Sequence, residues 1–171
     1  MYWIYYMAII VPAVSAADIA DVRALMIEYT NWVMPLTVGS DRPPTFEGLD
    51  EELASLPGSY APPLGQLYLA RHEGQPAGCV ALKPAGPAAG ELKRLYVRPA
   101  FRGLNLGGQL VAAVVQAARQ AGYQRLVLDS HKSMSHAHAL YRAAGFRDVE
   151  PPPDFPAALR PVVVFMQLTL A

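Results

Sequence analysis

The feature that most constrains the fold is a strand, a glycine-containing turn, a helix and a second strand that follow one another between Glu91 and Asp129. The sequence predicts strands at 91–97 and 125–129, and a helix at about 106–121 whose apolar residues share one face. These apolar residues are Leu106, Leu110, Val111, Val114, Val115 and Ala118. Gly122 stands where a helix C-terminus favours glycine. The segment therefore predicts a βαβ unit, in which a crossover helix joins two parallel strands.

Further strands and helices are expected on both sides of this unit. The expected strands lie at 8–11, 66–71, 76–82 and 162–168, and one more begins at Phe146. The expected helices lie at about 19–29, with Asp18 before the first turn, and at 49–56 and 136–144. The remaining stretches predict a loop-rich flap at 34–63, a hairpin turn at 72–75, and loops at 83–90 and 151–153.

Length and charge narrow the class of protein. A chain of 171 residues, 53% of them hydrophobic, suits one domain, 1–171, with a substantial core. Met7 as an alternative start would leave residues 1–6 as an extension of that domain. Lys plus Arg equals Asp plus Glu at 14 each, so no overall charge draws the protein to nucleic acid or to an anionic membrane.

Two further features bear on location. The apolar run at 1–14 is shorter than a bilayer span, stops at Pro12 and lacks the basic start of a signal peptide. The single cysteine, Cys79, cannot form an internal disulfide, and we expect a buried strand residue rather than a nucleophile. A reducing compartment, the cytoplasm, is the expected location.

The turn between the first strand and the helix of the βαβ unit is a candidate phosphate site. Between Lys93 and Asp129 the sequence has no acidic residue. It has the cations Arg94, Arg98, Arg102, Arg119 and Arg125. In the turn Arg102-Gly103-Leu104-Asn105-Leu106-Gly107-Gly108, backbone N–H groups and the positive helix end can converge on a phosphate. An ordinary tight connection with solvated arginines is the alternative.

Two common phosphate motifs do not fit this turn. A Walker loop needs Lys and then Ser or Thr after its last glycine, but Gln109 follows Gly108. A dinucleotide fingerprint needs a second glycine where Asn105 stands.

Two segments resemble motifs of the GNAT superfamily of N-acetyltransferases. Leu95-Tyr96-Val97-Arg98-Pro99 and the following 102–107 are similar to its acetyl-CoA motif, Gln/Arg-x-x-Gly-x-Gly/Ala, with Asn105 in the first motif glycine position. Asparagine tolerates left-handed backbone angles, so the turn can keep its shape. Downstream, the segment 137–146, with Leu140-Tyr141 and Gly145-Phe146, resembles the superfamily's Leu-Tyr-x-x-x-Gly-Phe element.

The resemblance implies a fold and a co-substrate. The fold would be single-domain α/β (α+β): a mixed, mostly antiparallel sheet of six to seven strands flanked by about four helices, with strands four and five parallel and splayed. The co-substrate would be acetyl-CoA, without a metal. Its pantetheine would lie along Leu95-Tyr96-Val97, and its pyrophosphate would lie on the N–H groups from Gly103 to Gly108, with Arg102 as a clamp.

The resemblance also implies catalytic roles. Tyr141 occupies the position whose hydroxyl protonates the CoA sulfur; a tyrosine that only packs is the alternative. Strand alternation places Glu91 on one face with Lys93, Leu95 and Val97. A glutamate there serves as general base in several members, while an ion-paired glutamate or water as the proton acceptor are the alternatives. The oxyanion is expected to meet a backbone N–H of the Leu95 strand.

The histidines near Asp129 invite a metal-site hypothesis, which the spacing disfavours. His136 and His138 would diverge on a helix, and no fourth ligand for a metal shared with His131 is evident. Contact of Asp129, Ser130 or His131 with the acceptor or the pantetheine is expected instead.

Acceptor selectivity is expected from two loops, 32–46 and 151–155. These two loops and the end of the helix expected at 19–29 contain the aromatic residues Tyr29, Trp32, Phe46 and Phe155. These line the acceptor site if they face it; packing on the core is the alternative.

The sequence thus predicts an N-acetyltransferase that moves an acetyl group from acetyl-CoA to a primary amine of a small molecule or peptide, by direct attack in a ternary complex. The alternatives are a catalytically inactive CoA-binding sensor or partner module, and a purely structural α/β domain. A homodimer is left open, and neither nucleic acid nor a membrane is an expected partner.

Overall fold

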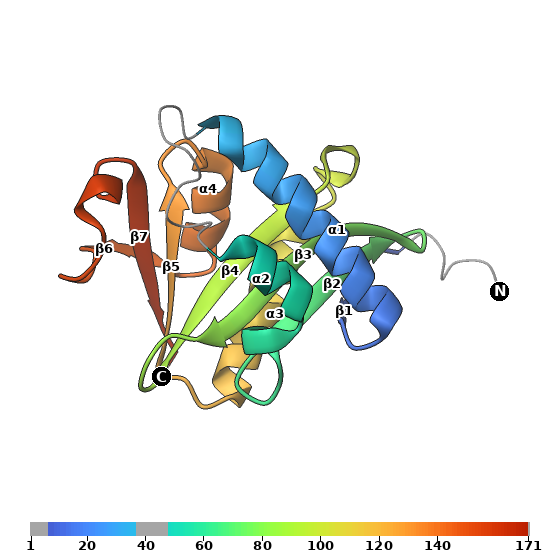
Figure 1. Cartoon of the computed structure of the whole chain (residues 1–171), viewed down its shortest axis with the longest axis horizontal. Coiled ribbons are helices and arrows are strands. Elements are labelled where there is room, and N and C mark those ends of the chain that lie inside the picture. Colours follow the sequence, from blue (N-terminus) through green and yellow to red (C-terminus); the bar gives the residue numbers. More distant parts are fainter. Residues whose placement is uncertain (1–6, 37–47, 171) are drawn as a thin grey trace.

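The fold has a single mixed sheet at its centre, and helices cover both faces of this sheet (Figure 1). This computed structural model describes residues 7–36 and 48–170. In them the sheet has seven strands in the order β1-β2-β3-β4-β5-β7-β6. The strands are β1 (Ile9–Pro12), β2 (Gln66–His72), β3 (Gln75–Pro84), β4 (Ala89–Val97), β5 (Arg125–His131), β6 (Arg147–Val149) and β7 (Val163–Thr169). The helices are α1 (Ala16–Val33), α2 (Leu49–Ser55), α3 (Leu106–Gln120) and α4 (Ser135–Ala143). Short 3₁₀ turns are η2 (Met34–Leu36), η4 (Gly58–Tyr60), η5 (Pro99–Phe101) and η6 (Ala157–Leu159).

The predicted βαβ unit is confirmed as β4-α3-β5, whose strands are parallel while all other neighbouring strands are antiparallel. The parallel pairing is short. It ends at the pair Glu91↔Val127, although β4 continues to Val97 and β5 to His131. The predicted splayed pair of strands four and five is therefore present, and the fold class is confirmed.

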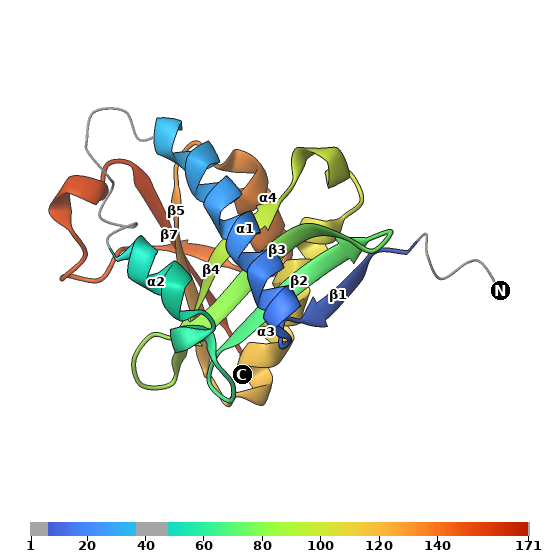
Figure 2. The same cartoon turned by 45° about the vertical axis from the view of Figure 1, so that its right-hand side comes forward.

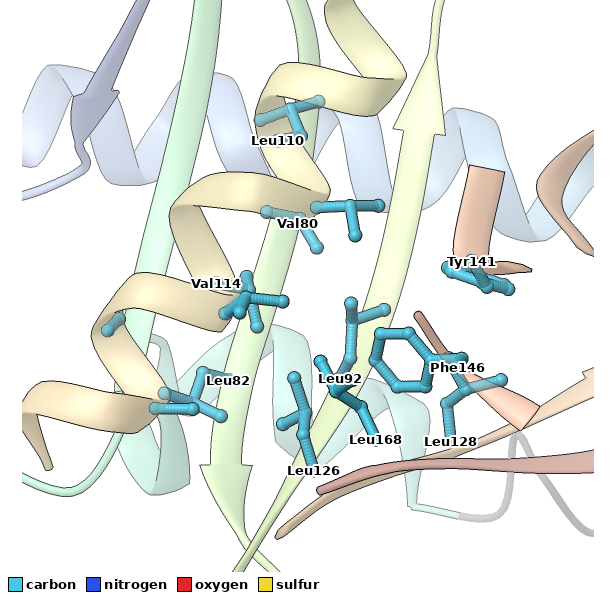
Figure 3. Close-up of a cluster of buried hydrophobic side chains, with 14 of the residues drawn as sticks. Val80, Leu82, Leu92, Leu110, Val114, Leu126, Leu128, Tyr141, Phe146 and Leu168 are labelled. Atoms are coloured by element: carbon cyan, nitrogen blue, oxygen red, sulfur yellow. The ribbon is translucent and has the colours of Figure 1, made fainter. Parts of the chain in front are cut away.

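Each face of the sheet has its own hydrophobic core. Helices α1 and α2 lie on one face, and α3 and α4 lie on the other (Figure 2). The core beneath α3 and α4 is shown in Figure 3; it includes Val80, Leu82, Leu92, Leu110, Val114, Leu126, Leu128, Tyr141, Phe146 and Leu168. The core beneath α1 includes Val22, Leu25, Met26, Leu67, Leu69, Cys79, Ala81 and Tyr96. Cys79 is fully buried, as predicted. Burying each large apolar side chain contributes about 1.5–3 kcal/mol, so these cores fix both helix layers on the sheet.

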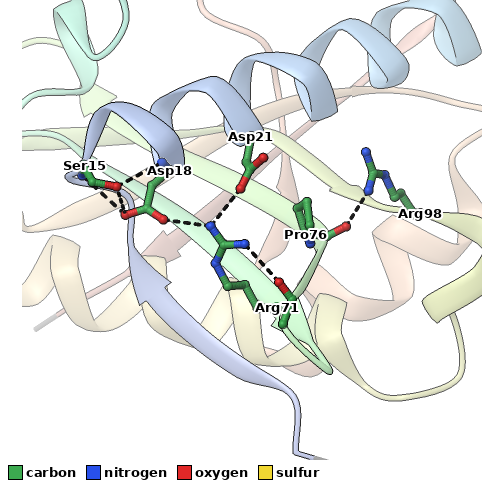
Figure 4. Close-up of polar contacts among 7 residues, drawn as sticks. Ser15, Asp18, Asp21, Arg71, Pro76 and Arg98 are labelled. Carbon is green, nitrogen blue, oxygen red and sulfur yellow. Dashed lines mark hydrogen bonds and ion pairs between the residues drawn. The ribbon is translucent and has the colours of Figure 1, made fainter. Parts of the chain in front are cut away.

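Helix α1 begins earlier than the sequence predicted. Its N-cap is Ser15, whose hydroxyl accepts a hydrogen bond from the Asp18 backbone N–H, while the Asp18 carboxylate accepts one from the Ser15 backbone N–H. Asp18 is therefore the third residue of the helix rather than its cap, and the two residues form a capping box. Arg71 of β2 also donates to Asp18 and Asp21, which joins the start of α1 to the sheet (Figure 4).

Strand β4 contains a β-bulge. Two residues of β4, Arg94 and Leu95, face the single residue Val80 of β3, and Arg94 has a left-handed φ of 58°. Since an extra residue breaks the alternation of a strand, side chains on the two sides of the bulge that would share a face point to opposite faces.

The bulge corrects the predicted position of Glu91. Lys93 lies opposite Ala81, which belongs to the core under α1, so Glu91 and Lys93 point to the α1 and α2 face. Leu95 and Val97 pack on the core under α3. The prediction that these residues share one face is right for Lys93 and wrong for Leu95 and Val97, because simple alternation assumes an unbroken strand.

Most predicted boundaries differ from the structure by a few residues. The hairpin strands β3 and β4 extend further than expected, so the loop predicted at 83–90 shortens to four residues, 85–88. Residues 1–6 and most of the flap, 37–47, lie outside the described residues. Within the described parts of the chain, no helix has the length and apolar character needed to cross a bilayer.

Candidate active site

A cavity of about 490 Å³ opens where β4 and β5 have stopped pairing. Its wall combines the end of β4, the turn before α3, the start and middle of α4, and α1. The lining residues are Tyr29, Trp32, Leu95, Tyr96, Val97, Phe101, Arg102, Gly103, Asn105, Leu106, Gly107, Gly108, Ser133, Met134, Ser135, His136, Ala137, Leu140 and Tyr141. Of the predicted cofactor-binding residues, only Leu104 is not part of this wall, and its side chain is exposed.

The turn before α3 presents unused backbone donors to the cavity. Among the described residues, the N–H groups from Gly103 to Gly108 have no hydrogen-bond acceptor, and the first bonded amide of the helix is that of Gln109, which donates to the Asn105 carbonyl. Asn105 has the left-handed φ of 56° that its motif position requires. Amides at the N-terminal end of a 15-residue helix add to its positive dipole, so this turn can bind an anion.

At the first turn of α3, any side chain larger than that of glycine would crowd neighbouring side chains. A Cβ on Gly107 would lie 2.7 Å from Cδ1 of Leu140, and a Cβ on Gly108 would lie 2.6 Å from Oδ1 of Asn105. Larger residues would force these neighbours to move. The two glycines therefore keep α3 close to α4 and leave the amides of the turn accessible.

Arg102 is the one cation of the acid-free stretch that lines the cavity. Its Nε donates to the Val97 carbonyl at 3.2 Å, and its guanidinium lies 5.2 Å from the Trp32 ring centroid, within range of a cation–π interaction. Arg94 and Arg98 are instead paired with Glu52 and Glu28. Two of the five arginines noted in the acid-free stretch are therefore neutralised by acids that are distant in sequence, on α1 and α2.

Tyr141 projects from α4 into the cavity wall. Its side chain is buried, and among the described residues its hydroxyl makes no hydrogen bond. Burial raises the pKa of this hydroxyl well above its ordinary value, with smaller contributions from Tyr29 and Asp129. The phenol therefore stays protonated at neutral pH and can act as a proton donor.

Glu91 lies outside the cavity wall. Its carboxylate is shared by two lysines, at 3.6 Å from Lys83 Nζ and 3.4 Å from Lys93 Nζ. The structure therefore shows the ion-paired glutamate that the sequence left as an alternative, on the α1 and α2 face of β4.

Asp129 lies on the neighbouring strand, β5, and, like Glu91, outside the cavity wall. Burial raises the pKa of its carboxyl group; Glu91 adds to this rise, while Lys93 and Arg94 oppose it. Its charge also acts on Tyr29 and Tyr141, which both line the cavity. The sequence indicated Asp129 only as a contact residue, because its position relative to these side chains depends on the divergence of β4 and β5.

The histidines at the end of β5 and on α4 have different partners. His131 Nδ1 lies 2.7 Å from the Ser133 hydroxyl, whereas His138 Nε2 lies 3.1 Å from the Ser130 hydroxyl. His136 lines the cavity. In residues 7–36 and 48–170, no three His, Cys, Asp or Glu side chains cluster as a metal ion would need.

The predicted aromatic lining is divided between two locations. Tyr29 and Trp32 line the cavity and lie 6.4 Å apart, centroid to centroid. Phe155 instead packs edge-on against Phe165 of β7 at 5.9 Å. Phe46 lies outside the described residues. The lining predicted from the sequence is therefore present on the α1 side.

Comparison with known proteins agrees with this geometry. The model of the acetyltransferase (GNAT) family matches residues 29–146, which contain the cavity wall. An N-acetyltransferase of Schizosaccharomyces pombe, itself uncharacterized, is 40% identical over 156 residues and covers 90% of each chain. The aminoglycoside N(6')-acetyltransferase type 1 of Stenotrophomonas maltophilia is 32% identical over 110 residues, which are 59% of this chain and 72% of that protein.

A solved structure shows the same fold. The PaiA N-acetyltransferase of Thermoplasma acidophilum, crystallised in complex with coenzyme A, superposes with a TM-score of 0.73 over 95% of this chain and 99% of that one, at 16% identity. Family match, relatives and fold agree with one another. The chain therefore belongs to the GNAT family of acetyltransferases and is an acetyl-CoA-dependent acyltransferase.

Proposed function

We propose that this chain transfers the acetyl group of acetyl-CoA to a primary amine by direct attack within a ternary complex. The observation that carries the proposal is the set of acceptor-free amides from Gly103 to Gly108, which face a cavity that also contains the Tyr141 side chain. A pyrophosphate on these amides, with Arg102 beside it, would direct the rest of the cofactor along Leu95-Tyr96-Val97 towards Tyr141. The coenzyme A complex of the Thermoplasma neighbour supports the choice of ligand.

Transfer needs a proton donor for the departing sulfur, a hydrogen-bond donor for the oxyanion and an acceptor for the amine proton. Residues of the cavity supply the first two. The Tyr141 hydroxyl gives its proton to the departing sulfur. Leu95 has no register partner on β3 because of the bulge, and a backbone N–H there is the proposed donor to the oxyanion. Water or a carboxylate takes the proton of the amine, and Glu91 was the sequence candidate for that role.

The proposed acceptor is an amine of a small molecule or peptide. An aminoglycoside acetyltransferase among the relatives supports a small molecule, and the aromatic side chains of Tyr29 and Trp32 offer it an apolar wall. A homodimer stays a prediction, which size-exclusion chromatography with light scattering would test. The cytoplasm also stays the expected location, on the ground of the single cysteine.

The test is release of CoA thiol from acetyl-CoA with an amine panel of kanamycin, spermidine, L-lysine and an alanine-terminated peptide. Native protein is compared with Tyr141→Phe and with the matched control Tyr68→Phe, a change on β2 away from the cavity wall. We expect Tyr141→Phe to lower kcat by about 10²–10⁴-fold. Its affinity for CoA, measured by calorimetry, should change less than twofold, and the control should keep native activity.

Two outcomes would contradict the proposal. Tight CoA binding by the native protein with no turnover of any amine would favour a CoA-binding module without transferase activity. The absence of a calorimetric signal with CoA would contradict the assignment of the turn as a phosphate site and would favour a structural domain.

A further inference from the structure

We propose that Asp129, rather than Glu91, is the carboxylate that binds the acceptor amine and takes its proton, an inference that rests on the proposed transfer to an amine. It gives the carboxylate role to β5 instead of β4. Four features of the structure support it: the position of Asp129 in the sheet, the absence of a bonded partner for its side chain among the described residues, the charges around it and its basicity.

The position of Asp129 follows from the end of the parallel pairing. The last pair joins Glu91 to Val127, and Asp129 is two residues further along β5 and so on the same face as Val127. Leu126 and Leu128 pack into the core under α3 and α4. Asp129 therefore points to the opposite face, that of α1 and α2, at the level where the gap between β4 and β5 opens.

The two carboxylates differ in how they are occupied. Glu91 has an ammonium group on each side, from Lys83 and Lys93. In residues 7–36 and 48–170, no ion pair or hydrogen bond joins the Asp129 side chain to another residue. An incoming amine would therefore displace nothing at Asp129, whereas at Glu91 it would compete with two lysines.

Charged and titratable groups approach Asp129 from three elements. The charges of Glu91, Lys93 and Arg94 on β4 act on the Asp129 carboxyl, and its own charge acts on Tyr29 of α1 and Tyr141 of α4. The two tyrosines also line the cavity. Asp129 and the proposed acid Tyr141 are thus close enough to influence each other's ionisation, as a base and an acid on two sides of one reacting carbonyl must be.

The environment also makes Asp129 a stronger base than an ordinary aspartate. Burial is the main cause that raises the pKa of its carboxyl group, and Glu91 adds to it. A carboxylate with a raised pKa holds a proton more readily, which improves its action as general base.

The step balances with these residues alone. The nitrogen of the neutral amine forms a bond to the thioester carbonyl carbon while Asp129 takes one N–H proton. The carbon–sulfur bond breaks, and the Tyr141 hydroxyl gives its proton to the sulfur. The proton on Asp129 then returns to the Tyr141 oxygen through water, so that an amine and a thioester become an amide and a thiol.

The experiment compares Asp129→Asn, Asp129→Glu and Glu91→Gln with native protein, using acetyl-CoA and whichever of the four panel amines is turned over fastest. Asp148→Asn, a change at an exposed ion pair on β6, is the matched control and should keep native activity. We expect Asp129→Asn to lower kcat/KM by about 10²–10⁴-fold, Asp129→Glu to recover part of it, and Glu91→Gln to lose less than about tenfold. Affinity for CoA should stay within twofold in all four.

The pH profile separates a base from a structural role. In Asp129→Asn, kcat/KM should rise with pH up to the pKa of the amine itself, because only the free amine can then react. The native profile should fall more steeply at low pH, because protonation of the Asp129 carboxyl then also stops transfer, and this additional fall should be absent from Asp129→Asn. A carbon-13 NMR titration of the Asp129 carboxyl in native protein, which needs no folded variant, should give a midpoint above the ordinary value of about 3.9.

The outcomes are distinguishable from failure of the proposed function. No turnover of any panel amine by native protein overturns the proposed function and this inference with it. The assignment of Asp129 alone is overturned if Asp129→Asn keeps native kcat/KM, or if kcat/KM falls as far in Glu91→Gln as in Asp129→Asn. A carboxyl midpoint at or below the ordinary value does the same.

Discussion

Replacing Arg94 with methionine tests how the bulge of β4 is held beneath α2. Nε and Nη2 of Arg94 donate to the two oxygens of Glu52 at 3.0 and 2.7 Å, and the Tyr60 hydroxyl donates to Oε1 at 2.7 Å. The Arg94 side chain is 5% exposed and that of Glu52 is 21% exposed. Removing one partner of a buried ion pair costs about 3–5 kcal/mol. Because water reaches Glu52 in part, we expect a loss of about 3 kcal/mol.

Urea unfolding followed by circular dichroism measures this loss. The corresponding fall in Tm is about 6–12 °C for a protein of this size. The double variant Arg94→Met/Glu52→Gln removes the orphaned charge but keeps an acceptor for Tyr60, so it should be more stable than Arg94→Met by about 1–2 kcal/mol. A loss below about 1 kcal/mol, or a double variant no more stable than the single one, would refute the account of a buried charge that needs its partner.

The same pair predicts a pH dependence. Burial alone would raise the pKa of Glu52, but hydrogen bonds from Arg94 and Tyr60 bring it below its ordinary value. A carboxyl with a lowered folded pKa stabilises the protein above its unfolded pKa of about 4.3 and loses that contribution as pH falls. The stability difference between native protein and Arg94→Met should therefore shrink below that pH.

Two further predictions concern α1 and the turn before α3. Hydrogen bonds from Arg71, and to a smaller extent from Ser15, lower the pKa of Asp18 to about 2. Arg71→Met should therefore lower the free energy of unfolding by about 1 kcal/mol at neutral pH, and this loss should fade between pH 4 and pH 2 in urea titrations. A loss that is constant with pH would contradict the pairing. Asn105→Gly should leave stability and CoA affinity near native, whereas Asn105→Ala, at the same left-handed φ, should lower the free energy of unfolding by about 1 kcal/mol, as measured by thermal unfolding. Equal losses in the two variants would show that the asparagine side chain matters more than its backbone conformation.

The sequence could predict the βαβ unit because its signals are local. Apolar spacing in α3, glycine after the helix, and two motifs in order are all readable along the chain, and the structure confirms the parallel pair and the two-faced sheet. The backbone shape of the turn before α3, the candidate phosphate site, was also predictable. Its amides belong to one short segment, so no distant residue decides their direction.

The errors arose where distant segments meet. No residue pattern marks a bulge at Arg94, since arginine seldom has a left-handed φ. The prediction that Leu95 and Val97 share the face of Glu91 was therefore wrong. The cations at Arg94 and Arg98 were assigned to an anion site because their acidic partners lie on α1 and α2, far away in sequence. The influence of the Asp129 charge on Tyr141 depends on how the strands and α4 lie in space, which a linear pattern does not record.

The buried position of Cys79 decides how this protein can be assayed. The chain has no other cysteine, and burial raises the pKa of its thiol to about 12. A thiol that is both enclosed and protonated reacts slowly with disulfide reagents. Colour from such a reagent therefore reports coenzyme A released into solution while the protein is folded, and a slow additional equivalent per chain reports the fraction that has unfolded.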